Sequence, residues 1–413
     1  MVISVISLFR WGSQNSANAA APRTRVLAGR MDGAAFPFRE LKLGPQSAPA
    51  REQTPGAWTT PAGSPKSLRP LISVIVLNYN GAPWLKRCLD SIRGQTLSDQ
   101  IEVIVADNAS ADQSYQLAKE LMRDWPRGLA VQLGTNLGYT EGNNRAAGQA
   151  HGQYLFFLNN DSWLEPDCLE NLMRETRAAE AAVAGPLVMN YSDGFPQQDA
   201  SREGFDVFGF LCTPALGPGL HEIFVAGGCA LLVDADWFRE LGGFDRQFFM
   251  YADEHDLCWR AWVAGARVIL APSAKAYHRS AASVNPHGHD RIVEIRTSDT
   301  KRFYANRNGL LVLLKNAEHV LLVIVPLQLL LLAAETLGVA MLTRRWSHFR
   351  RAFIEAVSDC WRLRRHIMAE RRRVRKLRHH GDFWMLRFLR LRLNRWEEFR
   401  RVCRFGSLKV DPK

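Results

Sequence analysis

The sequence predicts an α/β protein with a mainly parallel, mixed sheet, and three observations support this fold class. From residue 70 onwards, short β-rich runs alternate with helical stretches, which is the pattern of parallel strands joined by crossover helices. The run 154–158 is apolar without alternation, as expected of a strand that is buried on both faces. The second half combines strand-like and helical runs less regularly, which favours a mixed sheet.

The individual elements follow in chain order. A strand at 72–77 precedes a helix that begins near Pro83, because proline is favoured in a first turn and apolar residues then recur at helical spacing, at Leu85, Cys88, Leu89 and Ile92. The first half continues with a strand at 101–106, a helix at 115–122, a short strand at 130–133, a helix at 143–150 and the strand at 154–158. In the second half we expect strands at 224–233 and 267–270 and a helix at 253–263.

The composition indicates a globular protein with a basic C-terminal region. Hydrophobic residues make up 47% of the 413 residues, which excludes overall disorder. The seven cysteines form no Cys-x-x-Cys pair, so reduced thiols in a cytosolic setting are expected. Between Arg344 and Arg401 there are 19 Lys and Arg against 6 Asp and Glu, so the net charge of +12 belongs to this tail. Such a tail suits an anionic membrane surface or nucleic acid.

Polar residues follow three of the predicted strands. They are Asn78 and Asn80 after the first, Asp107, Asn108 and Ser110 after the second, and Asn159, Asn160 and Asp161 after the strand at 154–158. The carboxyl ends of parallel strands meet at one edge of a sheet, so these residues line a crevice. Carboxylate and amide oxygens suit Mg²⁺ or Mn²⁺ together with phosphate, which predicts a nucleotide pocket. The alternative is that they only cap helices and form turns.

Two further segments add candidate residues to this pocket. The loop 136–144 contains Asn136, Asn143, Asn144 and a glycine, Gly138, that allows close approach of a ligand to the backbone. Asp107 is a candidate acceptor for a pyrimidine imide or a ribose hydroxyl. His278, after the strand at 267–270, would complete a metal shell, or it is a hydrogen-bonded structural histidine.

The acidic cluster 253–256 is the candidate source of a general base. Asp253, Glu254 and Asp256 open the predicted helix, where the macrodipole favours carboxylates without any catalytic role. Aromatic residues surround the cluster in the sequence, and they would partly desolvate a carboxylate and raise its pKa towards the range that suits a base. Both interpretations remain open from the residues alone.

Taken in order, these segments resemble the family 2 glycosyltransferases, and most closely their rhamnosyltransferase-like branch. The resemblance covers residues 70–310 and rests on the motifs at 72–80, 105–112, 136–144, 157–161, 227–232 and 242–256. It implies a GT-A fold and an inverting transfer of a sugar, rhamnose among the candidates, from a nucleoside-diphosphate sugar. The implied acceptor is a hydroxyl of a lipid-linked or polysaccharide molecule in cell-surface glycan synthesis.

The resemblance also implies roles for single residues. The catalytic base is Glu254, with Asp253 second, and the divalent metal (Mg²⁺ or Mn²⁺) is held by Asp161 with His278. The donor-binding residues are Asn78, Asn80, Asp107, Asn108, Asn136, Gly138, Asn143, Asn144 and Asn159. Asn159 departs from the family's Asp-x-Asp motif, and because an amide carries no charge it should weaken metal binding.

Two other function classes are weaker. A nucleotidyltransferase that makes an activated sugar would be expected to have a glycine-rich basic loop after the first strand, and residues 78–84 contain none. The interpretation as a nucleic-acid-binding protein depends on the basic tail alone and leaves the polar strand ends unexplained. No nucleic acid partner is therefore expected.

We expect four regions: a flexible extension at 1–69, the GT-A domain at 70–309, hydrophobic membrane-associating helices at 310–343 and a basic amphipathic helical tail at 344–413. The uncharged stretch 320–334 has 15 residues and is too short to cross a bilayer, and its extension to residue 342 includes Glu335. A single crossing would also separate the catalytic domain from the basic tail, and both belong inside. We therefore expect a helix or helical hairpin in the cytoplasmic leaflet of the inner membrane, peripheral or monotopic, unless it is a buried core helix.

Overall fold

The computed structural model describes residues 69–191, 196–197, 201–213, 221–279, 295–391 and 408–411. The chain divides into two compact units, residues 1–56 and 57–413, and every described residue lies in the second. The expected N-terminal extension therefore lies outside the described residues, except for Arg69.

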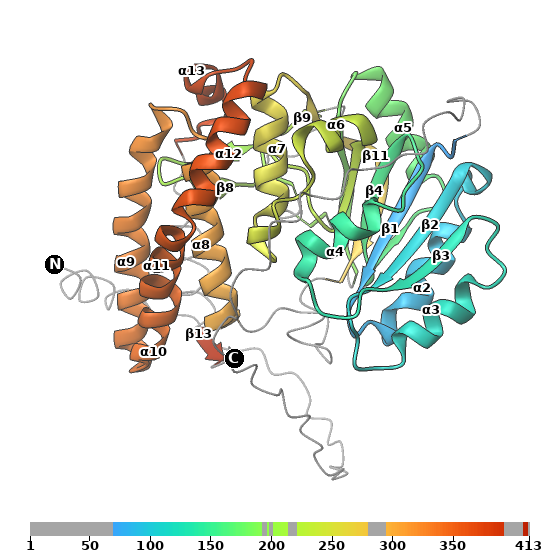
Figure 1. The fold of residues 1–413 in the computed structure, drawn as a ribbon, viewed down its shortest axis with the longest axis horizontal. Helices are drawn as coiled ribbons and strands as arrows, with labels where there is room; N and C mark the ends of the chain where they lie inside the picture. The colour runs from blue at the N-terminus through green and yellow to red at the C-terminus, as the bar shows by residue number, and fades with distance from the viewer. Residues whose placement is uncertain are drawn as a thin grey trace, which may run out of the picture. The chain divides into compact units, whose positions relative to one another are not determined.

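The centre of this unit is a mixed sheet, which has nine strands within the described residues (Figure 1). Its order is β3-β2-β1-β4-β10-β6-β11-β5, with β9 beside β11. The strands are β1 (Ile72–Asn78), β2 (Ile101–Asp107), β3 (Gly128–Gln132), β4 (Tyr154–Asn159), β5 (Ser162–Leu164), β6 (Val183–Asn190), β9 (His221–Glu222), β10 (Ala230–Asp234) and β11 (Val268–His278). Strands β1 to β4 are parallel, whereas β10 is antiparallel to β4 and β6. The predicted mixed sheet is confirmed.

Helices cover both faces of the sheet because the buried strands present apolar side chains on both sides. Val74 belongs to a hydrophobic cluster that also contains residues of α2 (Ala82–Arg93), α3 (Ser114–Met122) and α5 (Cys168–Ala178). The next residue, Ile75, belongs to the cluster on the other face, which contains residues of α4 (Gly138–Ala147), α6 (Ala235–Leu241) and α7 (Asp253–Val263). Pro83 lies in the first turn of α2, as predicted.

A helical region follows the sheet, as predicted (Figure 1). It consists of α8 (Asp299–Asn316), α9 (Ile324–Thr343), α10 (Trp346–Phe349), a π-helical turn (Arg350–Glu355), α11 (Ala356–Arg362), α12 (Arg364–Leu377) and α13 (Asp382–Met385). Helix α8 packs against α7, and its residues Leu310, Leu311 and Leu313 belong to the same hydrophobic cluster as Phe157 of β4. Two short sheets pair β7 (Gly204–Phe205) with β8 (Leu211–Cys212), and β12 (Ile295–Ser298) with β13 (Leu408–Asp411).

Most elements lie within two residues of the predicted ranges, and three differ by more. Helix α4 begins at Gly138 and not at residue 143, because Gly138 has a φ of 75°, which glycine adopts without steric cost. Strand β10 begins at Ala230, since Phe224 and Val225 bond the backbone of Arg202 instead. Strand β11 continues to His278 through an irregularity between Ala271 and Lys275, and the predicted strand ended at residue 270.

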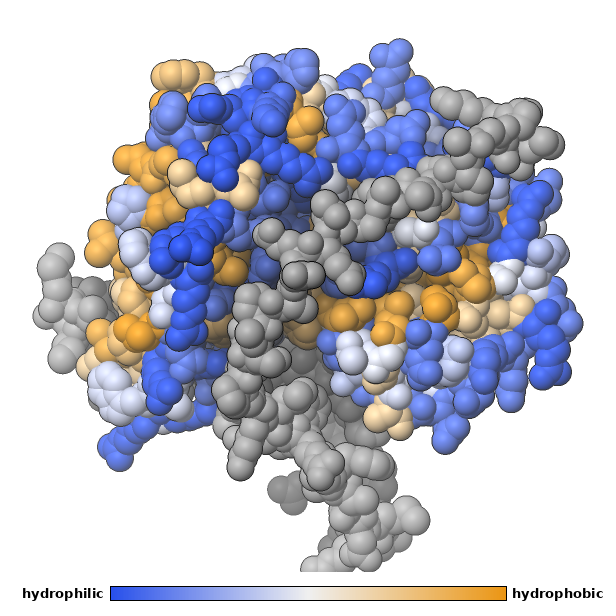
Figure 2. All heavy atoms as spheres, in the orientation of Figure 1, coloured by the Kyte–Doolittle hydropathy of each residue, from blue (hydrophilic) through white to orange (hydrophobic). Residues whose placement is uncertain are grey.

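Helix α9 has an unusual distribution of side chains. Its buried face repeats every four residues and includes two polar residues, Gln328 and Thr336. Its outer face is apolar, with Val323, just before the helix, 64% exposed and Leu330 70% exposed. Figure 2 shows hydrophobic side chains gathered over α9, with hydrophilic ones beside them. The helix is long and apolar enough to cross a membrane by length and composition.

Candidate active site

The first part of the site lies at the carboxyl ends of β1 and β2. The amide nitrogen of Asn78 donates to Asp107 over 3.0 Å and to Ser114 over 2.8 Å, and Asn160 Nδ2 donates to Asn78 Oδ1 over 2.9 Å. Asp107 is fully buried and also accepts from the Ser110 backbone N–H over 3.1 Å. Asn78, Asp107 and the residue before Asp161 are therefore joined in one network, in which Asp107 supports the protein's own loops.

The loop residues predicted to bind the donor also bond the protein. Asn108 Nδ2 donates to Asn136 Oδ1 over 3.0 Å and to the Gly138 carbonyl over 3.2 Å, and Asn80 Oδ1 accepts from the Ala111 N–H. Asn143 donates to the Tyr139 carbonyl.

Asn144 acts between two loops. Its amide donates to the Phe244 carbonyl over 2.7 Å, and its oxygen accepts from the Phe244 N–H over 2.9 Å. This pair fixes the loop at 242–245 against α4. The amides of this region thus shape the pocket wall through bonds within the protein.

The candidate metal ligands meet because of strand pairing. Ser162 of β5 lies opposite His278 of β11, which brings Asp161 Oδ1 to 3.4 Å from His278 Nε2. Burial lowers the pKa of His278, but Cys229 and Asp161 beside it raise it, and the net pKa lies well above its usual range. The Asn159 side chain is half-buried and has no hydrogen-bond partner among the described residues.

The turn at 228–229 lies between the candidate metal ligands, Asp161 and His278, and the acidic residue Glu254. Because β10 pairs antiparallel with β4, Cys229 lies beside Asn159, whose N–H donates to the Cys229 carbonyl over 2.9 Å. The neighbouring Gly228 faces Glu254 and accepts the Tyr139 hydroxyl over 2.6 Å. Asp161 and Glu254, 93 positions apart in the sequence, therefore lie on either side of one turn.

Burial tunes the two candidate bases. It raises the pKa of Asp253 well above the usual range, and the carboxylates of Glu254 and Asp256 raise it further. Burial also raises the pKa of Glu254, while the positive charge of Arg202 acts in the opposite direction. Burial and the carboxylates of Asp253 and Glu254 raise the pKa of Tyr139. The site therefore holds carboxyl groups whose proton affinity suits a general base.

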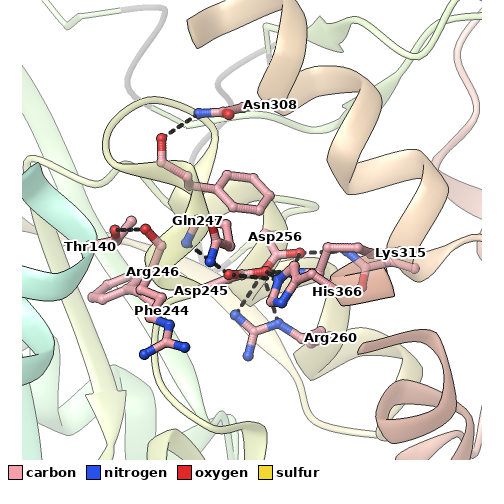
Figure 3. Close-up of polar contacts among 12 residues, drawn as sticks. Thr140, Phe244, Asp245, Arg246, Gln247, Asp256, Arg260, Asn308, Lys315 and His366 are labelled. Atoms are coloured by element: carbon pink, nitrogen blue, oxygen red, sulfur yellow. Dashed lines mark hydrogen bonds and ion pairs between the residues drawn. The ribbon is translucent and has the colours of Figure 1, made fainter. Parts of the chain in front are cut away.

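Asp256, from the same acidic cluster, has a different position. It is buried beside Arg260, with an ion-pair distance of 2.8 Å, and beside Lys315, at 3.1 Å. Lys315 also pairs with Asp245, which His366 contacts over 2.8 Å (Figure 3). This network is structural and ties α7 and the loop at 245 to α8 and α12.

The side chains at this site could hold a divalent cation only if a bound diphosphate supplied further oxygen ligands. Among the described residues, no group of three or more His, Cys, Asp and Glu is arranged to hold a metal ion. Asp161 and His278 offer one oxygen ligand and one nitrogen ligand at one place, and Asn159, the last residue of β4, precedes Asp161 by two positions. Mg²⁺ is often bound by one or two protein carboxylates together with phosphate oxygens and water, so these residues fit a cation that arrives with a diphosphate.

Three residues near the acidic pair were not predicted. Tyr139 and Gly228 contact each other, and Arg202 influences Glu254 electrostatically. The glycine pair at 227–228 was part of the motif, but nothing in the sequence indicated which carboxylate it would face. Arg202 precedes Glu254 by 52 positions and lies in no recognisable motif.

Comparison with known proteins agrees with the motifs. Residues 73–242 match the model of the family described as "Glycosyl transferase family 2". N-acetylglucosaminyl-diphospho-decaprenol L-rhamnosyltransferase of Mycobacterium tuberculosis is 28% identical over 242 residues, which are 52% of this chain and 77% of that protein. Glycosyltransferase GlyA of Streptococcus pneumoniae is 34% identical over 125 residues, 30% of this chain and 18% of GlyA.

The other matches differ in how much of each chain they cover. The chain covers 30% or less of the length of five of the curated relatives. Among solved structures, S. aureus TarS 1-349 in complex with UDP-GlcNAc aligns with a TM-score of 0.49 and 17% identity, over 74% of this chain and 90% of that chain. GalNAc-T7 with UDP, GalNAc and Mn²⁺ aligns with a TM-score of 0.48 and 16% identity, over 60% and 48% of the two chains.

Proposed function

Since residues 73–242 form a glycosyltransferase family 2 domain with the expected GT-A type of fold, we propose that this chain is an inverting transferase for a nucleoside-diphosphate sugar. The acceptor is a hydroxyl of a lipid-linked or polysaccharide molecule in cell-surface glycan synthesis. Rhamnose is the first sugar to test, because one relative is named as an L-rhamnosyltransferase acting on a polyprenyl diphosphate sugar. The observation that supports this proposal most is that the turn 228–229 has Glu254 against Gly228 on one side and, at Cys229, Asn159, two residues before Asp161, on the other.

In the proposed reaction, Glu254 accepts the proton of the acceptor hydroxyl. The hydroxyl oxygen forms a bond to the anomeric carbon while the bond from that carbon to the diphosphate oxygen breaks, and the anomeric centre inverts. The raised pKa of Glu254 favours proton transfer. Asp253 is the second candidate base, because it is adjacent and also has a raised pKa.

On the other side of the turn, Asp161, Asn159 and His278 would face the diphosphate. They are the residues that would hold Mg²⁺ or Mn²⁺, which when bound supplies positive charge to the leaving diphosphate. Asn78, Asn80, Asp107, Asn108, Asn136, Gly138, Asn143 and Asn144 shape the donor pocket, mainly through the bonds that they make to neighbouring loops.

We further propose that α9 lies in the cytoplasmic leaflet of the inner membrane, so that the chain is a peripheral or monotopic protein. In water, polar side chains belong on the outer face of a helix, but α9 buries Gln328 and Thr336 and exposes Leu330. This inverted arrangement is favourable when the outer face contacts lipid. Helix α12 supplies arginines for anionic headgroups.

The transferase proposal is tested by incubating the purified full chain with a panel of nucleotide sugars and polyprenyl or glycan acceptors, with Mg²⁺, Mn²⁺ or a chelator. Transfer from one donor, with inversion at the anomeric carbon, supports the proposal. Formation of a nucleotide sugar from nucleoside triphosphate and sugar phosphate would indicate the nucleotidyltransferase instead. If a chelator does not affect the activity, transfer does not require a divalent metal.

The membrane proposal is tested by sedimentation of the full chain with vesicles that contain anionic lipid. Leu330→Glu is expected to reduce binding strongly, because a carboxylate would enter the apolar leaflet. Leu129→Glu on β3, also at an exposed hydrophobic residue, is the matched control. Equal binding of both variants would contradict the placement of α9.

A further inference from the structure

The segment 247–252, directly before the helix that carries Glu254, has an unfavourable backbone conformation. Three of its residues that are not glycine have positive φ, namely Phe249 (62°), Tyr251 (70°) and Ala252 (60°). Such residues are uncommon and persist only when the surrounding structure holds them. At Phe249 the chain makes a γ-turn, in which the Met250 N–H donates to the Phe248 carbonyl over 2.7 Å.

Helix α8 holds this segment through one buried amide. Asn308 is fully buried, and its Nδ2 contacts the carbonyl oxygens of Phe248 at 2.9 Å, Met250 at 2.7 Å and Tyr251 at 2.8 Å. Figure 3 shows Asn308 reaching towards this loop from its own helix. A single side chain thus gathers carbonyl groups on both sides of the strained turn.

Arg307 fixes the orientation of that amide. Its Nε donates to Asn308 Oδ1 over 2.9 Å, which leaves the Asn308 nitrogen directed at the loop. The Arg307 guanidinium also donates to the carbonyls of Gln247, over 2.6 Å, and Phe248, over 3.1 Å. Asp359 of α11 holds the guanidinium from the other side over 2.9 Å.

The carbonyl of Phe249 faces the donor side of the site. Phe249 O accepts from the N–H groups of Tyr139, over 2.6 Å, and Thr140, over 3.3 Å, at the beginning of α4. A Cβ on Gly138 would lie 2.5 Å from the same oxygen. The carbonyls of residues 247 to 251 are therefore all held, from α4 on one side and α8 on the other.

We propose that Asn308, oriented by Arg307, is a positioning residue that holds the segment 247–252 and so sets the direction of the Glu254 carboxylate. The proposal rests on the proposed function, in which Glu254 is the base. Asn308 and Arg307 lie outside the residues that match the family model, and they belong to the helical region rather than to the sheet. In this account α8 completes the active site without contacting the substrate.

Helix α8 provides a matched control for the test. Asn306 is also a buried amide, 5% exposed, and donates over 2.9 Å to the Ala352 carbonyl, away from the segment 247–252. Asn308→Ala and Asn306→Ala each remove one buried amide from the same helix. Both should lower the melting temperature, so stability alone does not separate them.

The experiment measures kcat, KM for the donor and binding of the nucleoside diphosphate in the full chain. Asn308→Ala is expected to lower kcat by about 10²-fold, because a misplaced catalytic group costs about that much. Its KM for the donor and its diphosphate binding should remain unchanged, since the Asn308 amide nitrogen bonds Phe248, Met250 and Tyr251 and none of the proposed donor-binding residues. Asn306→Ala should keep its kcat. If Asn308→Ala accumulates poorly, Asn308→Ser, which keeps one donor, is measured in its place and should show a smaller loss of kcat.

The outcomes separate the two proposals. Equal kcat in the Asn308 and Asn306 variants, while Glu254→Gln is inactive, would overturn the positioning role and leave the proposed function intact. A higher KM for the donor or weaker diphosphate binding in Asn308→Ala would also overturn the positioning role. A wild-type chain that transfers no sugar from any donor, or an active Glu254→Gln, would remove the proposed function and this inference with it.

Discussion

The carboxylate of Glu254 lies directly against Gly228: a Cβ atom added to Gly228 would be 3.5 Å from Glu254 Oε2. That separation is an ordinary van der Waals contact, so a methyl group fits and a branched side chain does not. We predict that Gly228→Ala keeps most of the transfer activity, whereas Gly228→Val loses kcat by displacing the carboxylate. Steady-state kinetics together with melting temperatures check this. Equal activity of the two variants would contradict the proximity of residue 228 to the reacting groups.

The pH dependence of transfer should follow the charge around Glu254. A base must be deprotonated, so activity falls as the pH drops through its pKa, and burial places that pKa above the usual range of a glutamate. Arg202 opposes this shift. Arg202→Gln should therefore raise the pKa of Glu254 and move the acid limb of kcat/KM to higher pH. Asp253 and Tyr139 also lie near the Glu254 carboxylate. If the acid limb of kcat/KM moved to lower pH in Arg202→Gln, a residue other than Glu254 would cause that limb.

His255 should make the fold sensitive to acid. Burial lowers the pKa of His255 to about 3, and among the described residues its Nε2 has no hydrogen-bond partner. Between about pH 6 and pH 4 the unfolded chain binds a proton there that the folded chain does not, so the unfolding free energy falls by about 1.4 kcal/mol for each unit of pH decrease.

His255→Phe removes this proton and keeps the ring contacts with Phe224 and Trp259. We predict that urea unfolding of the variant depends less steeply on pH over this range. An unchanged slope would show that other groups cause the acid sensitivity.

Lys315 should be among the most stabilising charged residues. It is fully buried and pairs with Asp245 and Asp256, so Lys315→Met leaves two buried carboxylates without this partner. Removing one member of a buried ion pair costs about 3–5 kcal/mol. The control is Lys86→Met, which breaks an exposed pair with Asp90 and should cost about 0–1 kcal/mol. Similar unfolding free energies for the two variants would contradict the structural role of the buried network.

The sequence predicted the sheet well because its strands are strongly apolar and end in polar residues. The positions of Asn78, Asp107 and Asn159 at strand ends are confirmed. The starting residue of α4 was missed because it depends on the positive φ of Gly138, which residue type alone does not require.

Long-range contacts were beyond prediction. The partners of Asp256 on α8, Lys315 and Asn316, and the carbonyl groups held by Asn308 lie about sixty positions away in the chain, and no local pattern encodes such pairings. The same limit explains why the sequence did not reveal the hydrogen bonds that Asp107 accepts from Asn78 and Ser110; the role of Asp107 towards the donor stays a prediction.

The most direct test of the central claim is sugar transfer by Glu254→Gln, with Glu120→Gln, at an exposed residue of α3, as the control. We predict that Glu254→Gln binds the nucleoside diphosphate like the wild type and transfers almost no sugar, while Glu120→Gln is fully active. Near-normal turnover by Glu254→Gln would contradict the claim that the carboxylate facing Gly228 is the catalytic base.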